Sequence, residues 1–216
     1  MDWRPGVVPD TVTVRWCTAD GDERRRARVL LLRTAAELLQ VPLSEVSLEH
    51  EPGGRPYLGG AGGPLRVSLT HGRGVLAVAL TGRAPVGVDV EVVRRVRATA
   101  MARAWLDPAE AAWVEGLAER DRSAAFLWLW TQKEAVGKAL GQGLRGGGMS
   151  RPMPLPRQWP PPEDAPGGLT PLPGAPGLAS AAVVVGGGGH VVGVALHGRE
   201  GDVRIDVCRV PAAACD

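Results

Sequence analysis

Two ten-residue segments that lie 116 positions apart match each other, and this internal match constrains the fold more than any other feature. Residues 74–83 (GVLAVALTGR) align without gaps with residues 190–199 (HVVGVALHGR), and six of the ten positions are identical. Strand composition alone could produce a short apolar match, but the shared Gly-Arg after Ala-Leu favours a duplication. A further apolar run with a central acid follows each copy, at Asp89 in the first half and Asp206 in the second. The sequence therefore predicts a chain made of two similar halves.

The first half shows one helix pattern followed by strand patterns. Residues 24–39 are helix formers without Pro or Gly, and Val41-Pro42 ends the run. The first turns of this helix are rich in arginine, which is locally unfavourable at a helix N-terminus, so either a bound anion or a solvated basic face is expected there. Apolar runs at 65–69 and 75–80 predict a β-hairpin, and residues 86–91 predict a third strand.

The second half contains helix boundaries that are readable from the sequence. Asp107 precedes a proline and lies three residues before Glu110, which is the pattern of a capping box at a helix start. Another helix is expected from about residue 123 to residue 140, where Gly141 stops it. Residues 141–180 are so rich in Gly and Pro that we expect a long mobile loop.

These patterns together predict an α+β fold of two similar α/β halves related by pseudo-twofold symmetry. Each half is expected to pack a long helix on a small antiparallel sheet of three strands. The expected division is into an N-terminal half, residues 1–97, and a C-terminal half, residues 98–216.

Composition and charge exclude several classes of protein. Hydrophobic residues make up 44% of the chain and charged residues 22%, which is typical of a soluble globular protein. No apolar stretch is long enough for a membrane helix, and the formal net charge of +2 gives no general basic field. The three cysteines are widely spaced, which argues against a disulfide framework or a zinc site. We therefore expect a cytoplasmic protein whose partners are neither membranes nor nucleic acids. We also expect it to be a monomer.

Two carboxylates are expected on one face of the strand at 86–91. Because side chains alternate along a strand, Gly87, Asp89 and Glu91 should point to the face opposite the valines. Like charges so close together repel unless a cation lies near them, and a hard divalent ion is the natural candidate. The alternative is a strand end that exposes two solvated acids, and the strand pattern alone leaves both interpretations open.

The helix at 123–140 carries both lysines of the chain, Lys133 and Lys138, among 25 basic residues. Glu134 and Lys138 are one helical turn apart and therefore share a face. They could form a simple surface ion pair, but arginine would serve such a pair equally well and is used nearly everywhere else in this sequence. A site that needs an ammonium group able to give up a proton requires lysine. We therefore favour a chemical role for Lys138.

Three carboxylates near a lysine suit phosphate-ester or pyrophosphate chemistry on a metal-bound substrate. The chain contains no GxSxG elbow, no Cys/His nucleophile pair and no P-loop, which disfavours hydrolases and kinases of those kinds. Gly87-Val-Asp-Val-Glu91 and, about forty residues later, Trp130-Thr-Gln-Lys-Glu-Ala-Val-Gly-Lys138 resemble the paired signatures of the 4′-phosphopantetheinyl transferases. The length, the duplicated halves and the upstream Gly54-Arg-Pro56 and Ser68-Leu-Thr-His71 make the chain resemble the surfactin-synthetase-activating (Sfp-like) type of this family.

This resemblance implies transfer of the 4′-phosphopantetheine arm of coenzyme A to a serine of an acyl or peptidyl carrier protein, with release of adenosine 3′,5′-bisphosphate. It implies that Asp89, Glu91 and Glu134 hold Mg²⁺ on the pyrophosphate. Glu134 would also take the proton from the serine hydroxyl, and Lys138 would stabilise or protonate the leaving phosphate. These roles agree with the chemistry, since a metal and a lysine offset the charge that develops at the broken P–O bond.

The resemblance also implies binding residues for both substrates. The phosphates of coenzyme A would be held by basic and hydroxyl side chains: Arg28, Arg55, Thr70, His71 and Lys133. Lys133 lies on a different side of the helix from Glu134 and Lys138, so its role could instead be structural. Thr70 stands where the family often has a serine. Carrier proteins are acidic, so a basic surface between the halves is a candidate docking site, formed by Arg94, Arg95, Arg97 and Arg103 with Met101 and Trp105.

Two other functions fit parts of the same pattern. A non-catalytic module would bind coenzyme A or a carrier protein without transfer, although such a binder has little need for both Glu134 and Lys138. A metal-dependent pyrophosphatase that acts on a nucleotide-like substrate would use a similar set of carboxylates.

Overall fold

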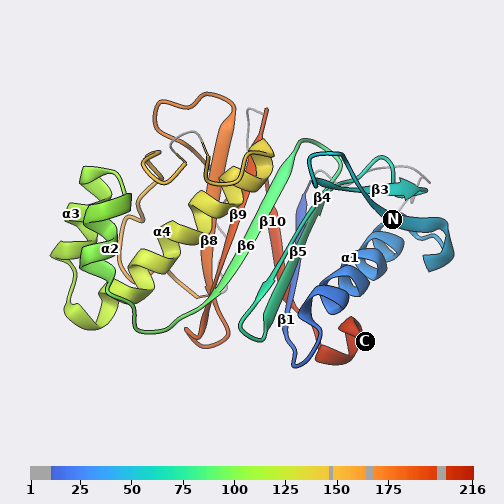
Figure 1. The fold of residues 1–216 in the computed structure, drawn as a ribbon, viewed down its shortest axis with the longest axis horizontal. Helices are drawn as coiled ribbons and strands as arrows, with labels where there is room; N and C mark the ends of the chain where they lie inside the picture. The colour runs from blue at the N-terminus through green and yellow to red at the C-terminus, as the bar shows by residue number, and fades with distance from the viewer. Residues whose placement is uncertain (1–10, 146–147, 164–167, 199–202) are drawn as a thin grey trace.

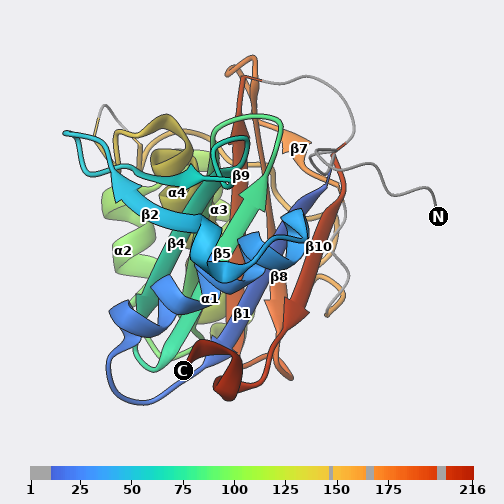
Figure 2. The same cartoon turned by 90° about the vertical axis from the view of Figure 1, so that its right-hand side faces the viewer.

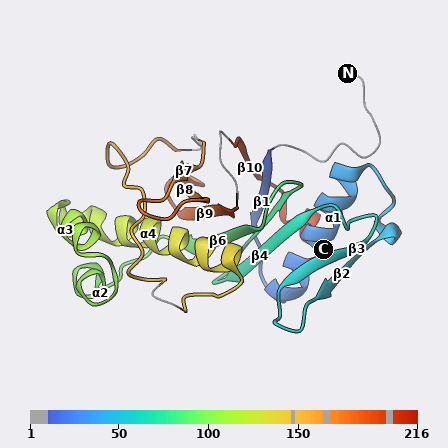
Figure 3. The same cartoon turned by 90° about the horizontal axis from the view of Figure 1, so that it is seen from above.

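A computed structural model describes residues 11–145, 148–163, 168–198 and 203–216. Two β-sheets pack face to face at the centre, and one long helix covers the outer face of each sheet (Figure 1). The valine-rich inner faces of the two sheets form a shared core. Seen from above, the two long helices lie on opposite sides of the paired sheets (Figure 3). The described residues therefore form a helix, sheet, sheet and helix arrangement.

The first sheet has the strand order β10-β1-β5-β4. Its strands are β1 (Val12–Thr18), β4 (Arg66–Gly72), β5 (Val75–Thr81) and β10 (Ile205–Arg209). Helix α1 (Glu23–Leu39) lies across the outer face, where its leucines join a core cluster with the leucines of β5 (Figure 2). Because β10 runs parallel to β1 while β4, β5 and β1 are antiparallel, this sheet is mixed.

The second sheet has the strand order β6-β9-β8-β7 and is antiparallel throughout. Its strands are β6 (Val86–Val92), β7 (Thr170–Pro171), β8 (Leu178–Val185) and β9 (His190–His197). Helix α4 (Glu119–Leu140) covers the outer face and contacts β6, β8 and β9.

The remaining elements lie at the two ends of this arrangement. Strands β2 (Val46–His50) and β3 (Pro56–Gly60) form a separate hairpin beside α1 (Figure 3). Helices α2 (Ala98–Trp105) and α3 (Pro108–Gly116) precede α4, and two short 3₁₀ turns, η1 (Leu43–Glu45) and η2 (Ala212–Cys215), complete the chain. Within the described ranges, no helix combines the length and the apolar character that a membrane crossing needs.

The local predictions for the hairpin turn, the cap of α3 and the end of α4 are confirmed, although α4 begins at Glu119 rather than near residue 123. The hairpin of β4 and β5 turns at Arg73 and Gly74, whose φ angles of 56° and 77° are the left-handed values that a two-residue turn requires. Asp107 caps α3, and Glu110 completes the capping box. Helix α4 ends at Gly141, which adopts a left-handed φ of 71°.

The predicted grouping of strands was wrong. Strands β4 and β5 pair as expected, but β6 pairs with β9 in the second sheet, and β10 pairs with β1 in the first. Each half thus gives a strand to the sheet of the other half, and two four-stranded sheets replace the expected three-stranded antiparallel ones. In this position the valines of β6 face the first sheet while Gly87 faces α4, so both faces of the strand are covered.

Two parts of the predicted organisation stay predictions. The matching segments form β5 and β9, which are both interior strands of their sheets. The strand orders do not test the pseudo-twofold relation or the division at residue 97. The described part of residues 141–180 contains turns, β7 and the first residues of β8. Residues 146–147 and 164–167 of that segment, like Arg199 of the repeat, lie outside the described residues, and the mobility of the loop stays a prediction.

Helix α4 approaches the second sheet so closely that two strand positions have no room for a side chain. A Cβ atom at Gly87 would overlap the carbonyl oxygen of Ala135, and one at Gly193 would overlap that of Thr131. Both glycines lie within strands, so they are needed for space rather than for backbone freedom. The glycines therefore set the distance at which α4 lies above β6 and β9.

Replacing Gly87 with alanine is expected to lower the free energy of unfolding by about 3 kcal/mol, the upper range for overpacking, because helix or strand must shift. Urea denaturation followed by circular dichroism measures this change. Gly116 of α3 is a matched control, since an added Cβ there meets nothing within 4 Å. Gly116→Ala should leave stability unchanged or raise it by up to about 1 kcal/mol. Equal midpoints for Gly87→Ala and the wild type would contradict the close packing of α4.

Candidate active site

The structure brings the strand acids of β6 and the helix lysine of α4 together. The Nζ atom of Lys138 lies 2.8 Å from Oδ1 of Asp89 and 3.0 Å from the carbonyl oxygen of Val88. Thr70 of β4 donates its hydroxyl proton to the same Oδ1 atom at 2.9 Å. Asp89 is buried, with 8% of its surface exposed. An ammonium group and a carboxylate are thus held at the point where α4, β4 and β6 meet.

The other two carboxylates at this point repel each other and Asp89. Burial raises the pKa of Glu134, and the nearby charge of Asp89 raises it further, while Lys138 lowers it. Burial also raises the pKa of Glu91, although Arg94, 2.8 Å from its carboxylate, lowers it. Lys138 and Arg94 compensate the negative charges of the three acids only in part, so this environment favours an additional positive charge.

The three acids have the right chemistry to bind a hard divalent cation, but their present positions do not form a complete binding site. Carboxylate oxygens are the ligands that Mg²⁺ prefers, and the repulsion among the acids, which Lys138 and Arg94 compensate only in part, favours a cation. In the part of the chain that the structure describes, however, no three histidine, cysteine or acidic side chains converge closely enough to hold a metal ion. Asp89 contacts Lys138 and Thr70 through Oδ1, and Glu91 contacts Arg94 through Oε2, so among the described contacts each of these two carboxylates keeps one oxygen for a cation.

A hollow of about 440 Å³ opens beside Lys138, and six of its sixteen lining residues are arginine, lysine or histidine. They come from α1, from β2 and the turn after it, from β4 and from α4: Arg24, Arg28, His50, Arg55, His71 and Lys138. The contacts described for Lys138 use two of its three N–H donors, so the third is available to a ligand in this hollow. A hollow with this lining suits a molecule that carries several phosphates.

Four of the five predicted coenzyme A residues line the hollow: Arg28, Arg55, Thr70 and His71. Arg55 also donates to the carbonyl oxygen of Ala139 near the C-terminal end of α4, and Nδ1 of His71 lies 3.7 Å from the carboxylate of Glu23. The hydroxyl of Thr70 donates its hydrogen bond to Asp89, so this donor is used within the protein.

Two lining residues, Arg24 and His50, were missed from the sequence. Arg24 precedes Arg28 by one helical turn, so the two arginines share a face of α1, and like charges at this spacing are unfavourable without an anion. That spacing was readable from the sequence. His50 is the last residue of β2, and nothing in its local sequence indicates that it lies beside the arginines of α1.

Lys133, the fifth predicted coenzyme A residue, lies elsewhere. Its side chain has no exposed surface, and Nζ lies 2.7 and 3.0 Å from the two carboxylate oxygens of Glu110. The same Nζ donates to the carbonyl oxygen of Arg151, and Glu110 accepts the backbone N–H of Met153 at 2.7 Å. This geometry corrects the expected substrate contact and supports the structural alternative, because every donor of the ammonium group is already used in joining α3, α4 and the segment at 151–153.

Comparison with known proteins relates this site to one class. Residues 85–164 match the family described as the 4′-phosphopantetheinyl transferase superfamily. The matched region contains β6 and α4, and hence Asp89, Glu91, Glu134 and Lys138, but none of the arginines or histidines that line the hollow. The part of the chain that carries both motifs is therefore similar to 4′-phosphopantetheinyl transferases.

Three particular relatives illustrate the similarity. The chain is 34% identical over 118 residues to 4′-phosphopantetheinyl transferase AcpT of Salmonella typhimurium, covering 54% of this chain and 60% of AcpT. It is 28% identical over 129 residues to 4′-phosphopantetheinyl transferase HetI of a Nostoc species, covering 57% of this chain and 54% of HetI. It is 22% identical over 116 residues to 4′-phosphopantetheinyl transferase gsp of Aneurinibacillus migulanus, covering 54% and 47%. The chain thus spans about half to three fifths of the length of these relatives.

Replacing Lys133 with methionine should lower the free energy of unfolding by about 3 to 5 kcal/mol, because it leaves the charge of Glu110 buried without a partner. Adding Glu110→Gln should recover part of this loss, since the amide is neutral and its oxygen still accepts a backbone N–H. Urea denaturation of both single variants and the double variant measures the coupling. A Lys133→Met protein with wild-type stability and weakened coenzyme A binding would instead restore the substrate role.

Proposed function

We propose that this protein transfers the 4′-phosphopantetheine arm of coenzyme A to a serine of a carrier protein and releases adenosine 3′,5′-bisphosphate. The observation that carries the proposal is the position of Lys138, which lines the basic hollow and lies 2.8 Å from Asp89. A pyrophosphate bound in the hollow would then lie next to the amine of Lys138 and close to the acids that surround it. The similarity of residues 85–164 to phosphopantetheinyl transferases supports the same reaction.

The basic hollow provides the binding energy for coenzyme A in this proposal. Arg28 and Arg24 on one face of α1, together with His50 and His71, hold the 3′-phosphate and the neighbouring phosphates. Arg55 joins them while its bond to Ala139 fixes it against α4. The phosphates are thus held while the bond to be broken lies next to Lys138.

The three acids and Lys138 have different roles in the proposed reaction. Asp89, Glu91 and Glu134 would hold Mg²⁺, which when bound offsets charge on the pyrophosphate oxygens. Glu134 accepts the proton of the carrier serine, and its raised pKa brings it closer to neutral pH, where a general base is most effective. The serine oxygen forms the new P–O bond while the bond to adenosine 3′,5′-bisphosphate breaks. Lys138 stabilises the charge that this leaving phosphate acquires.

We further propose that the chain is of the surfactin-synthetase-activating type. The support is that two layers of helix and sheet occur in one chain, with β5 and β9 in matching interior positions. On this proposal one chain forms the whole site, because the hollow and the acids are contributed by its own two sheets and helices. The monomeric state and the cytoplasmic location stay predictions.

The central test weighs a carrier protein after incubation. An apo carrier protein, Mg²⁺, coenzyme A and the wild-type chain should give a carrier heavier by one phosphopantetheine group, and Glu134→Gln should slow this by about a hundredfold or more. Asp206→Asn is a matched control, because Asp206 is exposed and pairs only with Arg15 among its described contacts. Binding of coenzyme A without any mass gain on several carriers would favour the non-catalytic binding module. Release of phosphate products from coenzyme A without a carrier would favour a pyrophosphatase.

Replacing Lys138 with arginine should lower kcat by about tenfold or more, although the charge is kept. The guanidinium is larger, gives up a proton far less readily and has a different donor geometry from the ammonium that contacts Val88 and Asp89. Steady-state kinetics at saturating coenzyme A measure the change. Arg28→Lys is the matched control, for which the KM of coenzyme A should rise while kcat stays near the wild-type value. A Lys138→Arg enzyme with wild-type kcat would remove Lys138 from the chemical step.

A further inference from the structure

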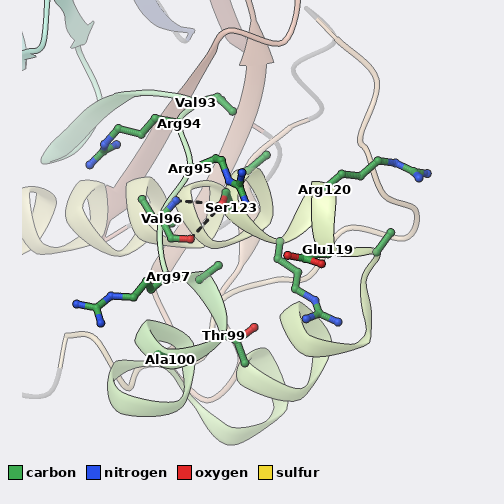
Figure 4. Close-up of a pocket in the computed structure, with 14 residues that line it drawn as sticks. Val93, Arg94, Arg95, Val96, Arg97, Thr99, Ala100, Glu119, Arg120 and Ser123 are labelled. Atoms are coloured by element: carbon green, nitrogen blue, oxygen red, sulfur yellow. Dashed lines mark hydrogen bonds between the residues drawn. The ribbon is translucent and has the colours of Figure 1, made fainter.

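The segment that follows β6 is held in place by backbone hydrogen bonds on both sides of Arg94. Residues 93–97 belong to one wall of a hollow of about 1050 Å³, and the start of α4 forms the other wall (Figure 4). The backbone N–H of Val93 donates to the carbonyl oxygen of Gly189 at 2.9 Å. The backbone N–H of Val96 donates to the hydroxyl of Ser123 at 3.1 Å, which joins the two walls (Figure 4). The position of Arg94 is therefore set by the fold.

Arg94 holds the carboxylate of Glu91. Its Nη1 atom donates to Oε2 of Glu91 at 2.8 Å and to the carbonyl oxygen of Val92 at 3.3 Å, so the guanidinium is tied to the end of β6 as well as to the acid. Glu91 accepts no other hydrogen bond from a described residue. Within the described part of the chain, Arg94 alone thus fixes the direction in which this carboxylate points.

The other acids of the site are limited in a similar way. Lys138 and Thr70 both donate to Oδ1 of Asp89, at 2.8 and 2.9 Å, and this leaves Oδ2 without a described contact. Glu134 accepts no hydrogen bond from a described residue, but the proposed function uses one of its oxygens for the serine proton. Each acid can therefore offer a cation about one oxygen rather than two.

The number of oxygens that each carboxylate offers affects which divalent cation binds. Ca²⁺ takes about six to eight oxygen ligands in flexible geometry and often binds both oxygens of a carboxylate, whereas the smaller Mg²⁺ demands near-ideal octahedral geometry and keeps several waters. A site whose carboxylates offer single oxygens suits Mg²⁺ and gives Ca²⁺ too few ligands. The contacts that occupy the remaining oxygens are therefore part of the cation site.

We propose that Arg94 is a positioning residue that makes this site prefer Mg²⁺ to Ca²⁺, because it occupies the second oxygen of Glu91. This inference rests on the proposed function, which assigns the three acids to a cation. Arg94 also repels any cation, since it carries charge of the same sign. The repulsion acts alike on Mg²⁺ and Ca²⁺, which both carry two charges, so it cancels in the ratio of their affinities. That ratio therefore reports the arrangement of the ligands and not the charge of Arg94.

The test measures cation binding in the absence of coenzyme A and carrier protein. Mn²⁺ binding to the wild type, Arg94→Met, Arg94→Lys and Arg95→Met is followed by electron paramagnetic resonance, with Mg²⁺ and Ca²⁺ as competitors. Arg94→Met should shift the ratio of affinities toward Ca²⁺ by about tenfold, the lower end of the effect of removing a partner of a metal-binding carboxylate. Arg94→Lys can still hold Oε2 and should keep most of the preference for Mg²⁺.

Arg95→Met is the matched control, because it removes the same charge one residue away. The side chain of Arg95 is exposed and has no hydrogen bond or ion pair with a described residue, so this variant should keep the wild-type ratio. Equal rises of both affinities in Arg94→Met would show only the loss of a charge and would overturn the proposal. An equal shift of the ratio in Arg95→Met would also overturn it.

Two further outcomes separate this proposal from the proposed function. A shifted ratio in Arg94→Met, without any mass gain on a carrier protein in the transfer assay, would support the role of Arg94 and overturn the transfer reaction. Transfer by a wild-type protein that binds no Mn²⁺ by itself, or whose ratio does not change in Arg94→Met, would leave the enzyme intact and overturn the role of Arg94. The contacts of Arg94 are made without a substrate, so its effect must be measurable without one.

Discussion

The close contact of α4 with β6 and β9 is the constraint on which the candidate active site depends. Gly87 and Gly193 leave no side chain between the helix and the sheet, so the backbone of α4 lies directly on these strands. At this separation Lys138 reaches both the carbonyl oxygen of Val88 and the carboxylate of Asp89. A side chain at either glycine would push the helix outward and lengthen both contacts. Gly87 and Gly193 are therefore as necessary for the geometry of the candidate active site as the acids are.

The exchange of β6 and β10 between the halves explains how the two parts of the site meet. Because β6 belongs to the second sheet, its acids and the residues of α4 form one unit, which is the part that matches the transferase superfamily. The basic hollow belongs mainly to α1, β2 and β4 on the side of the first sheet. Hydroxyl groups on β4 join the units, since Ser68 accepts the backbone N–H of Val88 and Thr70 donates to Asp89. Coenzyme A, on the proposed function, would bind across this junction.

The sequence predicted local features well and long-range ones poorly, for a physical reason. Strand alternation placed Gly87, Asp89 and Glu91 together on the face opposite the valines, and helix spacing placed Glu134 beside Lys138, because both patterns follow from backbone geometry. Which sheet β6 joins depends on pairing with β9, about a hundred residues later, and no local pattern specifies that partner. The burial of Lys133 likewise depends on Glu110 and on the fold of residues 151–153. The sequence therefore left both a structural and a substrate-binding role open for Lys133.

The two lysines of an arginine-rich chain are retained for different physical reasons. The ammonium group of Lys133 has three donors and meets three acceptors, the two oxygens of Glu110 and the carbonyl of Arg151, in a site without exposed surface. A guanidinium has five donors in a planar fork and would leave some of them buried without partners. Among the described residues Lys138 has two acceptors, and it lines the basic hollow with a third donor that none of these contacts uses. The same side chain therefore completes a closed network at one position, whereas at the other it leaves a donor for a phosphate, which arginine could not present in the same place.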